Sequence, residues 1–153
     1  MQHFLLQPKP IIDVRVLPDH DLNPANVIFE TTLGHHACYA LNTNPRNTLF
    51  GAYLHDSEQL AGVCVVEFPP TCNGYVSVEY LATTPTLQRK HSIGSTLMRH
   101  IEQQAEAARY IGVTVEPLPK AEEFYRKLGY KEPSEATPTE RILMGGLFFK
   151  NLR

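Results

Sequence analysis

An amphipathic helix between two short strands is the sequence feature that most constrains this fold. Apolar side chains recur at helical spacing over residues 93–111, with Arg, Glu and Gln between them, and Gly112 follows as a stop signal. Residues 75–83 before the helix and 113–116 after it have the composition of strands. A strand–helix–strand unit places its two strands parallel in one sheet. The sequence therefore predicts a mixed α/β domain with at least one parallel crossover.

The other elements follow from shorter patterns. A second helix is predicted over residues 119–128, where Gly129 suits a left-handed cap, and a short helix within residues 24–32. Further strands are predicted at residues 11–17, 50–55, 60–68, 130–131 and 142–150. Within the strand 75–83, strict alternation puts Val76, Val78 and Tyr80 on one face and Ser77, Glu79 and Leu81 on the other.

Size and composition point to one globular domain. The chain has 153 residues, of which 42% are hydrophobic and 20% charged, so we expect a single domain over residues 1–153. No apolar run is long enough to span a bilayer, and the first ten residues lack the pattern of a secretory signal. Three cysteines are too few for a disulfide framework, and His35, His36 and Cys38 lack a second ligand cluster at zinc-site spacing. We therefore expect a cytoplasmic protein with no metal and no membrane partner.

Charge is distributed unevenly along the chain. Residues 1–74 hold three Lys/Arg against seven Asp/Glu, a net charge of −4, whereas residues 75–153 hold eleven against nine, a net charge of +2. An overall net charge of −2 makes nucleic acid a poor partner, because its phosphates require a basic surface. The asymmetry fits a basic half that holds an anionic cofactor and an acidic half that receives a cation, or simply two solvated charged faces.

The loop between the predicted strand and the predicted helix contains the components of an anion site. Its residues are Arg89, Lys90, His91, Ser92, Ile93, Gly94 and Ser95. A helix start presents backbone N–H groups without intrahelical partners, together with the positive end of the helix dipole. Gly94 permits close backbone approach, the serines offer hydroxyl donors, and Arg89 and Lys90 add positive charge. By itself the loop is either a phosphate cradle or a basic, well-capped surface turn.

Three linked motifs resemble the GNAT superfamily of acyl-CoA N-acyltransferases. The loop resembles the signature Q/R-x-x-G-x-G/A of that family. Residues 79–85 resemble its central strand, which ends in a proline turn, and residues 121–130 resemble its segment A-x-x-F-Y-x-x-x-G-F/Y. The motifs stand in the family order and cover roughly residues 50–150. Three motifs in order are much more specific than any one of them.

The chain departs from the family pattern at three places. The signature falls on Arg89, Ser92 and Gly94, and Ser92 replaces the usual Gly. The turn after Pro85 is about one residue longer than is common in the family. Leu118 stands where many relatives have an Asn before the second motif, so the cofactor contact of that Asn is not carried over.

The resemblance implies a GNAT-like fold and an acyl-CoA co-substrate, usually acetyl-CoA. The expected fold is a mostly antiparallel sheet of about six to seven strands with one splayed parallel pair, flanked by about four helices. Residues 81–83 would splay from residues 113–115 and pair with the pantetheine arm, while the amides of residues 90–95 would meet the pyrophosphate. The implied cofactor-binding residues are Leu81, Ala82, Thr83, Arg89, Lys90, His91, Ser92, Ile93, Gly94, Ser95 and Phe124.

The implied reaction is direct transfer of an acyl group to an amine. It needs a base for the amine, a donor for the oxyanion and an acid for the departing thiolate. Tyr125 matches the family position of the acid, although helical spacing alone favours core packing. Glu79 and Glu116 are the rival candidates for the base, and either is alternatively a solvent-facing residue or an orienting contact for a cationic acceptor. The expected oxyanion donor is a backbone N–H near Ala82 or Thr83.

The acceptor amine is the part that the sequence determines least. Residues 20–48 and 131–142 would shape the acceptor pocket of such a fold, and they carry no recognisable signature. The acidic first half favours a cationic small molecule, such as a polyamine or an aminoglycoside, with a protein amino group as the alternative. The competing functions are a non-catalytic acyl-CoA-binding or protein-binding module and a nucleotide- or phosphate-binding regulator. The apolar residues 145–151 are the expected contact of a homodimer.

Overall fold

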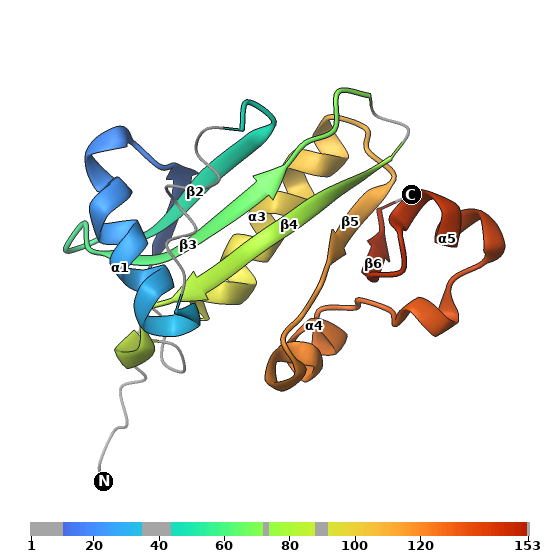
Figure 1. Ribbon diagram of the computed structural model, residues 1–153. Coiled ribbons are helices and arrows are strands. Elements are labelled where there is room, and N and C mark those ends of the chain that lie inside the picture. The colour runs from blue at the N-terminus through green and yellow to red at the C-terminus, as the bar shows by residue number, and fades with distance from the viewer. Residues whose placement is uncertain (1–10, 35–43, 72–73, 88–91, 153) are drawn as a thin grey trace, which may run out of the picture.

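The fold is built on one six-stranded sheet (Figure 1). The computed structural model describes residues 11–34, 44–71, 74–87 and 92–152. The strands are β1 (Ile12–Val16), β2 (Asn47–Leu54), β3 (Leu60–Glu67), β4 (Tyr75–Thr83), β5 (Gly112–Val115) and β6 (Phe148–Asn151), and they lie in that order across the sheet. All neighbours are antiparallel except β4 and β5, which run parallel. The predicted mixed α/β sheet with one parallel pair is confirmed.

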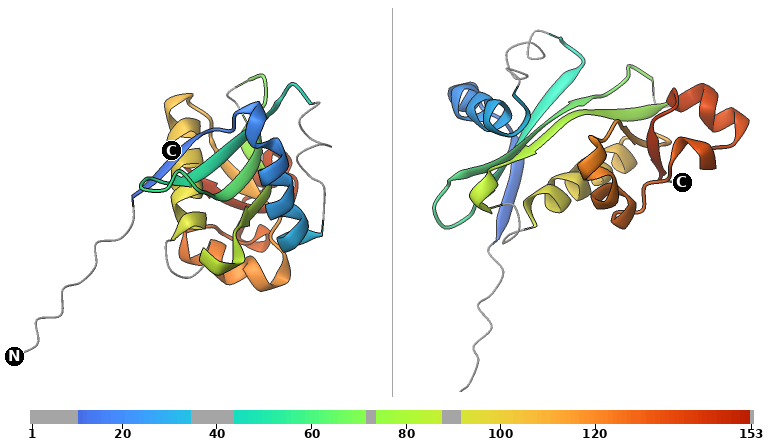
Figure 2. Two further views of the ribbon diagram at one scale, coloured as in Figure 1. Left: turned by 90° about the vertical axis from the view of Figure 1, so that its left-hand side faces the viewer. Right: turned by 60° about the horizontal axis from the view of Figure 1, so that its bottom comes forward.

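Helices cover both faces of the sheet. Figure 2 shows α1 (Leu22–Leu33) on one face and α3 (Ile93–Ala107) on the other, with α4 (Glu122–Lys127) and α5 (Pro138–Met144) near β5 and β6. Most of the predicted apolar stripe is buried on α3, namely Ile93, Leu97, Met98, Ile101 and Ala105. The helix ends at Ala107 rather than at residue 111, and the predicted stripe residue Ala108 is exposed. Burial of one large apolar side chain stabilises a protein by about 1.5–3 kcal/mol, so this stripe holds α3 on the sheet. No helix among the described residues is long and apolar enough to cross a membrane.

A β-bulge at Glu79 interrupts the ladder between β3 and β4. Two consecutive residues of β3 pair with Tyr80 and with Val78, which leaves Glu79 between them without an opposite residue. A bulge adds one residue to a strand and so reverses the alternation of faces beyond it. Val78 accordingly packs in the core beneath α3, Tyr80 packs against the core beneath α1, and Leu81 returns to the α3 side. The predicted strict alternation, with Tyr80 on the face of Val78 and Leu81 on that of Glu79, is therefore wrong.

The parallel strands β4 and β5 part soon after they meet. All four residues of β5 pair with β4, from Gly112 opposite Tyr75 to Val115 opposite Val78. Residues 81–83, which were expected to splay from β5, therefore lie beyond its end and pair with β3. The bulge stands directly after the last pair, and bulges bend a strand and increase its twist. The two strands are the splayed parallel pair that the resemblance implies.

The segment predicted as a closing strand over residues 142–150 divides into the end of a helix and a strand. Its first residues end α5, and β6 begins only at Phe148. The Thr137 hydroxyl accepts from the N–H of Glu140 at 3.2 Å, and the Glu140 carboxylate accepts from the N–H of Thr137 at 2.9 Å. This capping box, with Pro138 in the first turn, starts a helix that overrides the strand preference of the apolar residues after it.

Part of the outer edge of β6 pairs with another segment of the same chain. The strand predicted at residues 130–131 is reduced to one bridge, in which Lys131 and Phe149 exchange two backbone hydrogen bonds of 2.8 and 3.0 Å. Phe148 and Phe149 are both buried in the protomer's own core. The apolarity of residues 145–151 therefore no longer argues for a homodimer contact.

We predict that Gly112→Ala destabilises the protein strongly. A Cβ atom at Gly112 would lie 2.1 Å from the backbone oxygen of Lys150 and 2.9 Å from Cε1 of Tyr75, so the backbone of β6 would have to move. We expect the free energy of unfolding in urea to fall by about 2–3 kcal/mol. Gly74→Ala is the matched control, because nothing lies within 4 Å of the Cβ it would carry. Equal, small effects of both changes would contradict the close approach of β5 and β6.

Candidate active site

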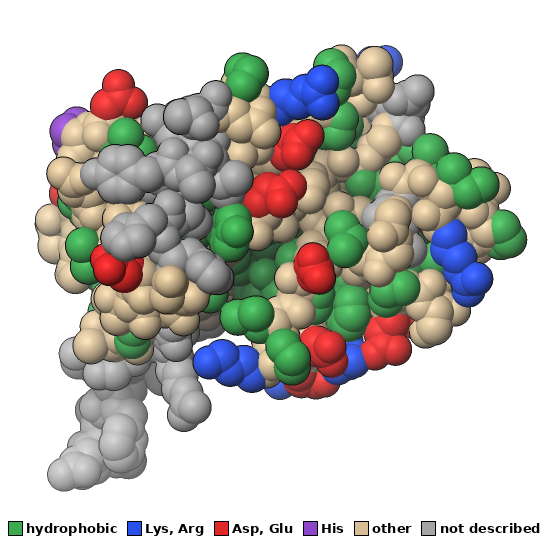
Figure 3. All heavy atoms as spheres, in the orientation of Figure 1, with side chains coloured by type: hydrophobic (Ala, Val, Ile, Leu, Met, Phe, Trp, Pro, Cys, Tyr) green, Lys and Arg blue, Asp and Glu red, His purple; other side chains and the backbone are tan. Residues whose placement is uncertain are grey.

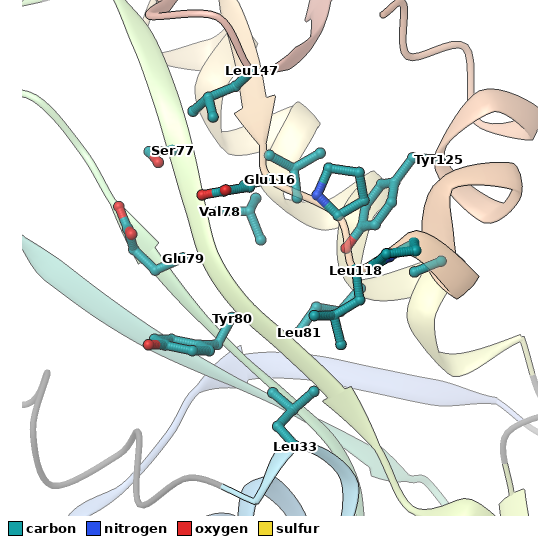
Figure 4. A pocket seen from close by; sticks show the side chains of 14 residues that line it. Leu33, Ser77, Val78, Glu79, Tyr80, Leu81, Glu116, Leu118, Tyr125 and Leu147 are labelled. Carbon is teal, nitrogen blue, oxygen red and sulfur yellow. The ribbon is translucent and has the colours of Figure 1, made fainter.

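A cavity of about 520 Å³ opens where β4 and β5 part. Its walls come from the bulged part of β4, from the end of β5 with the loop that follows, from α4, and from the last residue of α1. The space-filling view shows the molecule hollowed at this face, with acidic side chains around the hollow (Figure 3). The close view shows side chains from distant parts of the chain pointing into one space (Figure 4).

Tyr125 reaches this cavity from the short helix α4. Its side chain is 5% exposed, and its ring packs edge-on against Phe124 and Tyr130, with centroids 4.9 and 5.7 Å away. The hydroxyl points into the cavity (Figure 4) and has no hydrogen-bond partner among the described residues. Burial raises the pKa of the Tyr125 phenol well above its ordinary value, and the nearby Cys64 raises it further. The phenol is therefore protonated at neutral pH, as a proton donor must be.

A polar network behind Tyr125 ties α4 to α3 and β6. The Lys150 ammonium donates to the Glu102 carboxylate at 2.8 Å and to the backbone oxygen of Leu128 at 2.9 Å. The Tyr130 hydroxyl donates to the same carboxylate at 2.9 Å. A six-residue helix is not stable alone, so contacts of this kind must hold α4, and with it Tyr125, in place.

The two predicted base candidates line the same cavity. Glu79 is the bulged residue of β4, and Glu116 directly follows β5, so each stands just after the last residue pair that joins the two strands. Both side chains are exposed. Neither makes an ion pair or a hydrogen bond with another described residue. Figure 4 shows both carboxylates on the side of the cavity away from the Tyr125 hydroxyl.

The start of α3 retains the features of an anion site within the part of the chain that is described. Ser92 precedes the helix with a left-handed φ of 52°, its side chain makes no capping hydrogen bond, and the first turn has no acidic residue. The N–H groups of the first helical residues therefore meet neither an intrahelical partner nor a carboxylate of the same turn. Arg89, Lys90 and His91, predicted to join this site, lie outside the described residues.

The other predicted cofactor residues lie between the start of α3 and the cavity. Leu81 lines the cavity, whereas Ala82 is buried beneath α1. The Phe124 ring stands over the start of α3, where a Cβ added to Gly94 would lie 3.2 Å from its Cζ atom. The same Cβ would lie 3.9 Å from Cγ2 of Thr83, so the end of β4 and the start of α3 are adjacent.

Some residues at the cavity were not predicted from the sequence. Leu33 lines the cavity and belongs to the first of the two segments expected to shape the acceptor pocket. None of residues 131–142, the second segment, lines it. Leu147 lines it from the turn before β6.

Ser77 and Tyr80 also line the cavity. Strict alternation already placed Ser77 on the face of Glu79, whereas it placed Tyr80 on the opposite face. Strict strand alternation does not anticipate a bulge, so it gives no signal for Tyr80 at the cavity.

Metal ligands do not gather anywhere in the part of the chain that the structure describes. No group of three or more His, Cys, Asp or Glu side chains there is placed to hold an ion. Cys64 is buried and unpaired, and burial raises the pKa of its thiol above the usual value, so it is neither a ready ligand nor a ready nucleophile. His35, His36 and Cys38 lie outside the described residues.

Comparison with protein families gives one match. The model described as the acetyltransferase (GNAT) family matches residues 13–130. This span runs from the second residue of β1 to the third residue after α4, and it includes the cavity lining apart from Leu147. No curated protein matches the chain.

Solved structures with the same architecture come from distant organisms. Gcn5 from Tetrahymena superposes with a TM-score of 0.74 at 13% identity, over 94% of this chain and 96% of that one. Ard1 from Thermoplasma volcanium superposes with a TM-score of 0.70 at 14% identity, over 93% of this chain and 98% of that one. The ribosomal-protein-S18-alanine N-acetyltransferase from Escherichia coli superposes with a TM-score of 0.67 at 17% identity, over 92% of this chain and 90% of that one. Identities this low show a common fold.

We predict that Ser92→Gly stabilises the protein, because an L side chain at a left-handed φ of 52° is strained. Relief of this strain, less the added entropy of glycine in the unfolded chain, should raise the free energy of unfolding by about 0.5–1 kcal/mol. Ser92→Ala is the control, since it removes the hydroxyl and keeps the strain. If alanine stabilises as much as glycine in the same urea titrations, the backbone is not the cause.

We also predict that Lys150→Met destabilises the protein by about 1–3 kcal/mol, since it leaves the mostly buried Glu102 carboxylate without its cation. Arg46→Met is the matched control. In the Arg46–Glu67 pair the arginine is exposed, the carboxylate is half-buried, and the two groups are 4.0 Å apart, so its loss should cost less than about 0.5 kcal/mol. Equal midpoints of urea unfolding for the two variants would show that the network behind Tyr125 does not stabilise α4.

Proposed function

Because this chain belongs to the acetyltransferase (GNAT) family, we propose that it transfers an acetyl group from acetyl-CoA directly to a primary amine, within a ternary complex. The amine belongs to a small molecule or to a protein. The observation that carries the proposal is the hydroxyl of Tyr125, which enters the cavity between β4 and β5 across from the carboxylates of Glu79 and Glu116 (Figure 4). An acid and a base that face one space are what acyl transfer to an amine requires.

Acetyl-CoA would bind at two adjacent places on this chain. The start of α3 would take the pyrophosphate through the N–H groups of Ile93, Gly94 and Ser95, a use for which helix starts are suited. Within the described chain, residues 81–83 have no strand beside them on the β5 side, although the Thr32 hydroxyl donates to the backbone oxygen of Thr83 at 3.3 Å. This edge of β4 would take the pantetheine arm as an added strand. The contacts of Arg89, Lys90, His91, Ser92 and Phe124 with the co-substrate remain predictions.

The proposed reaction makes one bond and breaks one. The amine nitrogen attacks the thioester carbonyl carbon, so a carbon–nitrogen bond forms, and the carbon–sulfur bond breaks as the intermediate collapses. The proton of the amine passes to Glu79, directly or through water, with Glu116 as the alternative acceptor. Tyr125 gives its proton to the departing thiolate. A backbone N–H near Ala82 or Thr83 would stabilise the oxyanion.

The acceptor is not carried over from the structural neighbours. The name of the Escherichia coli neighbour specifies an alanine of a ribosomal protein, and this chain shares only 17% identity with it. The second candidate function is a non-catalytic module that holds acyl-CoA or a protein partner on the same fold. The hydroxyl of Tyr125, free of other hydrogen bonds within the described chain, favours the enzyme.

We predict that Tyr125→Phe lowers kcat by about 100-fold or more while the Kd for acetyl-CoA stays within about twofold, because only the proton donor is removed. The Phe ring keeps the packing against Phe124 and Tyr130, so the fold should be unchanged. Activity is measured as free thiol released from acetyl-CoA across a screen of amines, and binding is measured by calorimetry.

Two results would contradict different parts of the proposal. A Tyr125→Phe variant as fast as the natural protein would show that this phenol is not the acid. A natural protein that binds acetyl-CoA tightly and releases no thiol with any amine would favour the non-catalytic module.

A further inference from the structure

The described lining of the cavity carries negative charge and no positively charged side chain. Glu79 and Glu116 are the two carboxylates among its described lining residues, and that lining includes no Lys, Arg or His. Neither carboxylate is neutralised by a described neighbour. An anionic cavity of this kind attracts a cation and repels an anion.

The rest of the cavity wall is mostly apolar. Leu33, Leu81, Leu118 and Leu147 enter it from four different parts of the chain (Figure 4). Such side chains cover methylene groups well and leave sugar hydroxyl groups without partners. This favours a linear aliphatic amine over an aminoglycoside.

Acyl transfer uses only one of the two carboxylates as a base. The attacking nitrogen must be neutral, so it gives up its proton and its charge before it reacts. The second carboxylate then remains charged beside the bound acceptor. Because both carboxylates are exposed, water solvates the second one before an acceptor binds, and its charge attracts a cation that binds beside it.

We propose that the acceptor is a small linear amine that carries a second cationic nitrogen, and that the carboxylate not used as the base binds this nitrogen. Glu79 lies within β4 and Glu116 follows β5, and each stands directly after the last pair that joins the two strands. Paired strands lie about 5 Å apart and these two part beyond their last pair, so a separation of about 5 Å or more corresponds to a spacer of about three to five methylene groups. This inference rests on the proposed acetyl transfer and identifies its substrate class.

The test compares two amines that differ in one group. The probes are 1,4-diaminobutane and pentylamine, in which a methyl group replaces the second ammonium. After correction for its two equivalent nitrogens, the diamine should have a kcat/KM at least about tenfold higher, because a charged hydrogen bond is gained. The preference should fall as salt is added. A lysine peptide with no other charge is included as a protein-like acceptor.

Variants then locate the origin of the preference. At least one of Glu79→Gln and Glu116→Gln should reduce the ratio of the two kcat/KM values to near one. A general loss of the base lowers both rates and leaves their ratio unchanged, so the ratio reports recognition alone. Glu106→Gln is the control, since Glu106 is an exposed carboxylate on α3 that does not line the cavity.

The outcomes separate this inference from the proposed function. Equal kcat/KM values for the diamine and pentylamine, a higher value for the lysine peptide, or a preference that both variants retain would overturn the inference while acetyl transfer stands. If no amine releases thiol, the proposed function fails, and equilibrium binding of the same two amines decides the inference. Tighter binding of the diamine would then support it, and equal affinities would overturn it.

Discussion

The candidate site depends on the end of hydrogen bonding between β4 and β5. The two parallel strands share four residue pairs, and the bulge at Glu79 follows directly after the last one. Had the ladder continued, residues 81–83 would have a strand on both sides and no cavity would open there. Backbone groups that lack a strand neighbour are costly unless water or a ligand satisfies them. The end of this ladder, with the bulge beside it, thus leaves both the cavity and an edge of β4 that a co-substrate can use.

The placement of Tyr125 depends on tertiary contacts rather than on its own helix. α4 has six residues, too few to be stable in isolation. Rings of Phe124 and Tyr130 hold the Tyr125 ring on two sides, and the pair of Lys150 with Glu102 fixes the chain just after the helix. These contacts bury the phenol and raise its pKa, while its hydroxyl still reaches the cavity. One arrangement therefore sets both the position and the protonation of the proposed acid.

Much of the fold could be predicted from local patterns in the sequence. The stripe on α3, the extent of β4 and the left-handed Gly129 all follow from periodicity and turn chemistry, and the structure agrees with each. The failures have physical causes. The bulge reverses the faces of Tyr80 and Leu81, and bulges leave no clear trace in a β-rich sequence. The helix α5 was missed although its signal is present in the sequence, where Thr137 and Glu140 form a capping box.

The candidate site was predictable in part. Motif resemblance indicated Tyr125, Glu79 and Glu116, and the structure brings all three to one cavity, although their roles remain proposals. Leu33 and Leu147 could not be predicted, because only the three-dimensional fold brings the end of α1 and the turn before β6 together.

The most direct test of this account is a crystal structure of the protein with CoA bound. The account predicts that the pantetheine arm lies along residues 81–83 in the space where β4 and β5 part, with the sulfur atom facing the hydroxyl of Tyr125 and the pyrophosphate at the start of α3. A CoA molecule bound elsewhere, or one whose sulfur lies outside the cavity of Glu79 and Glu116, would contradict it.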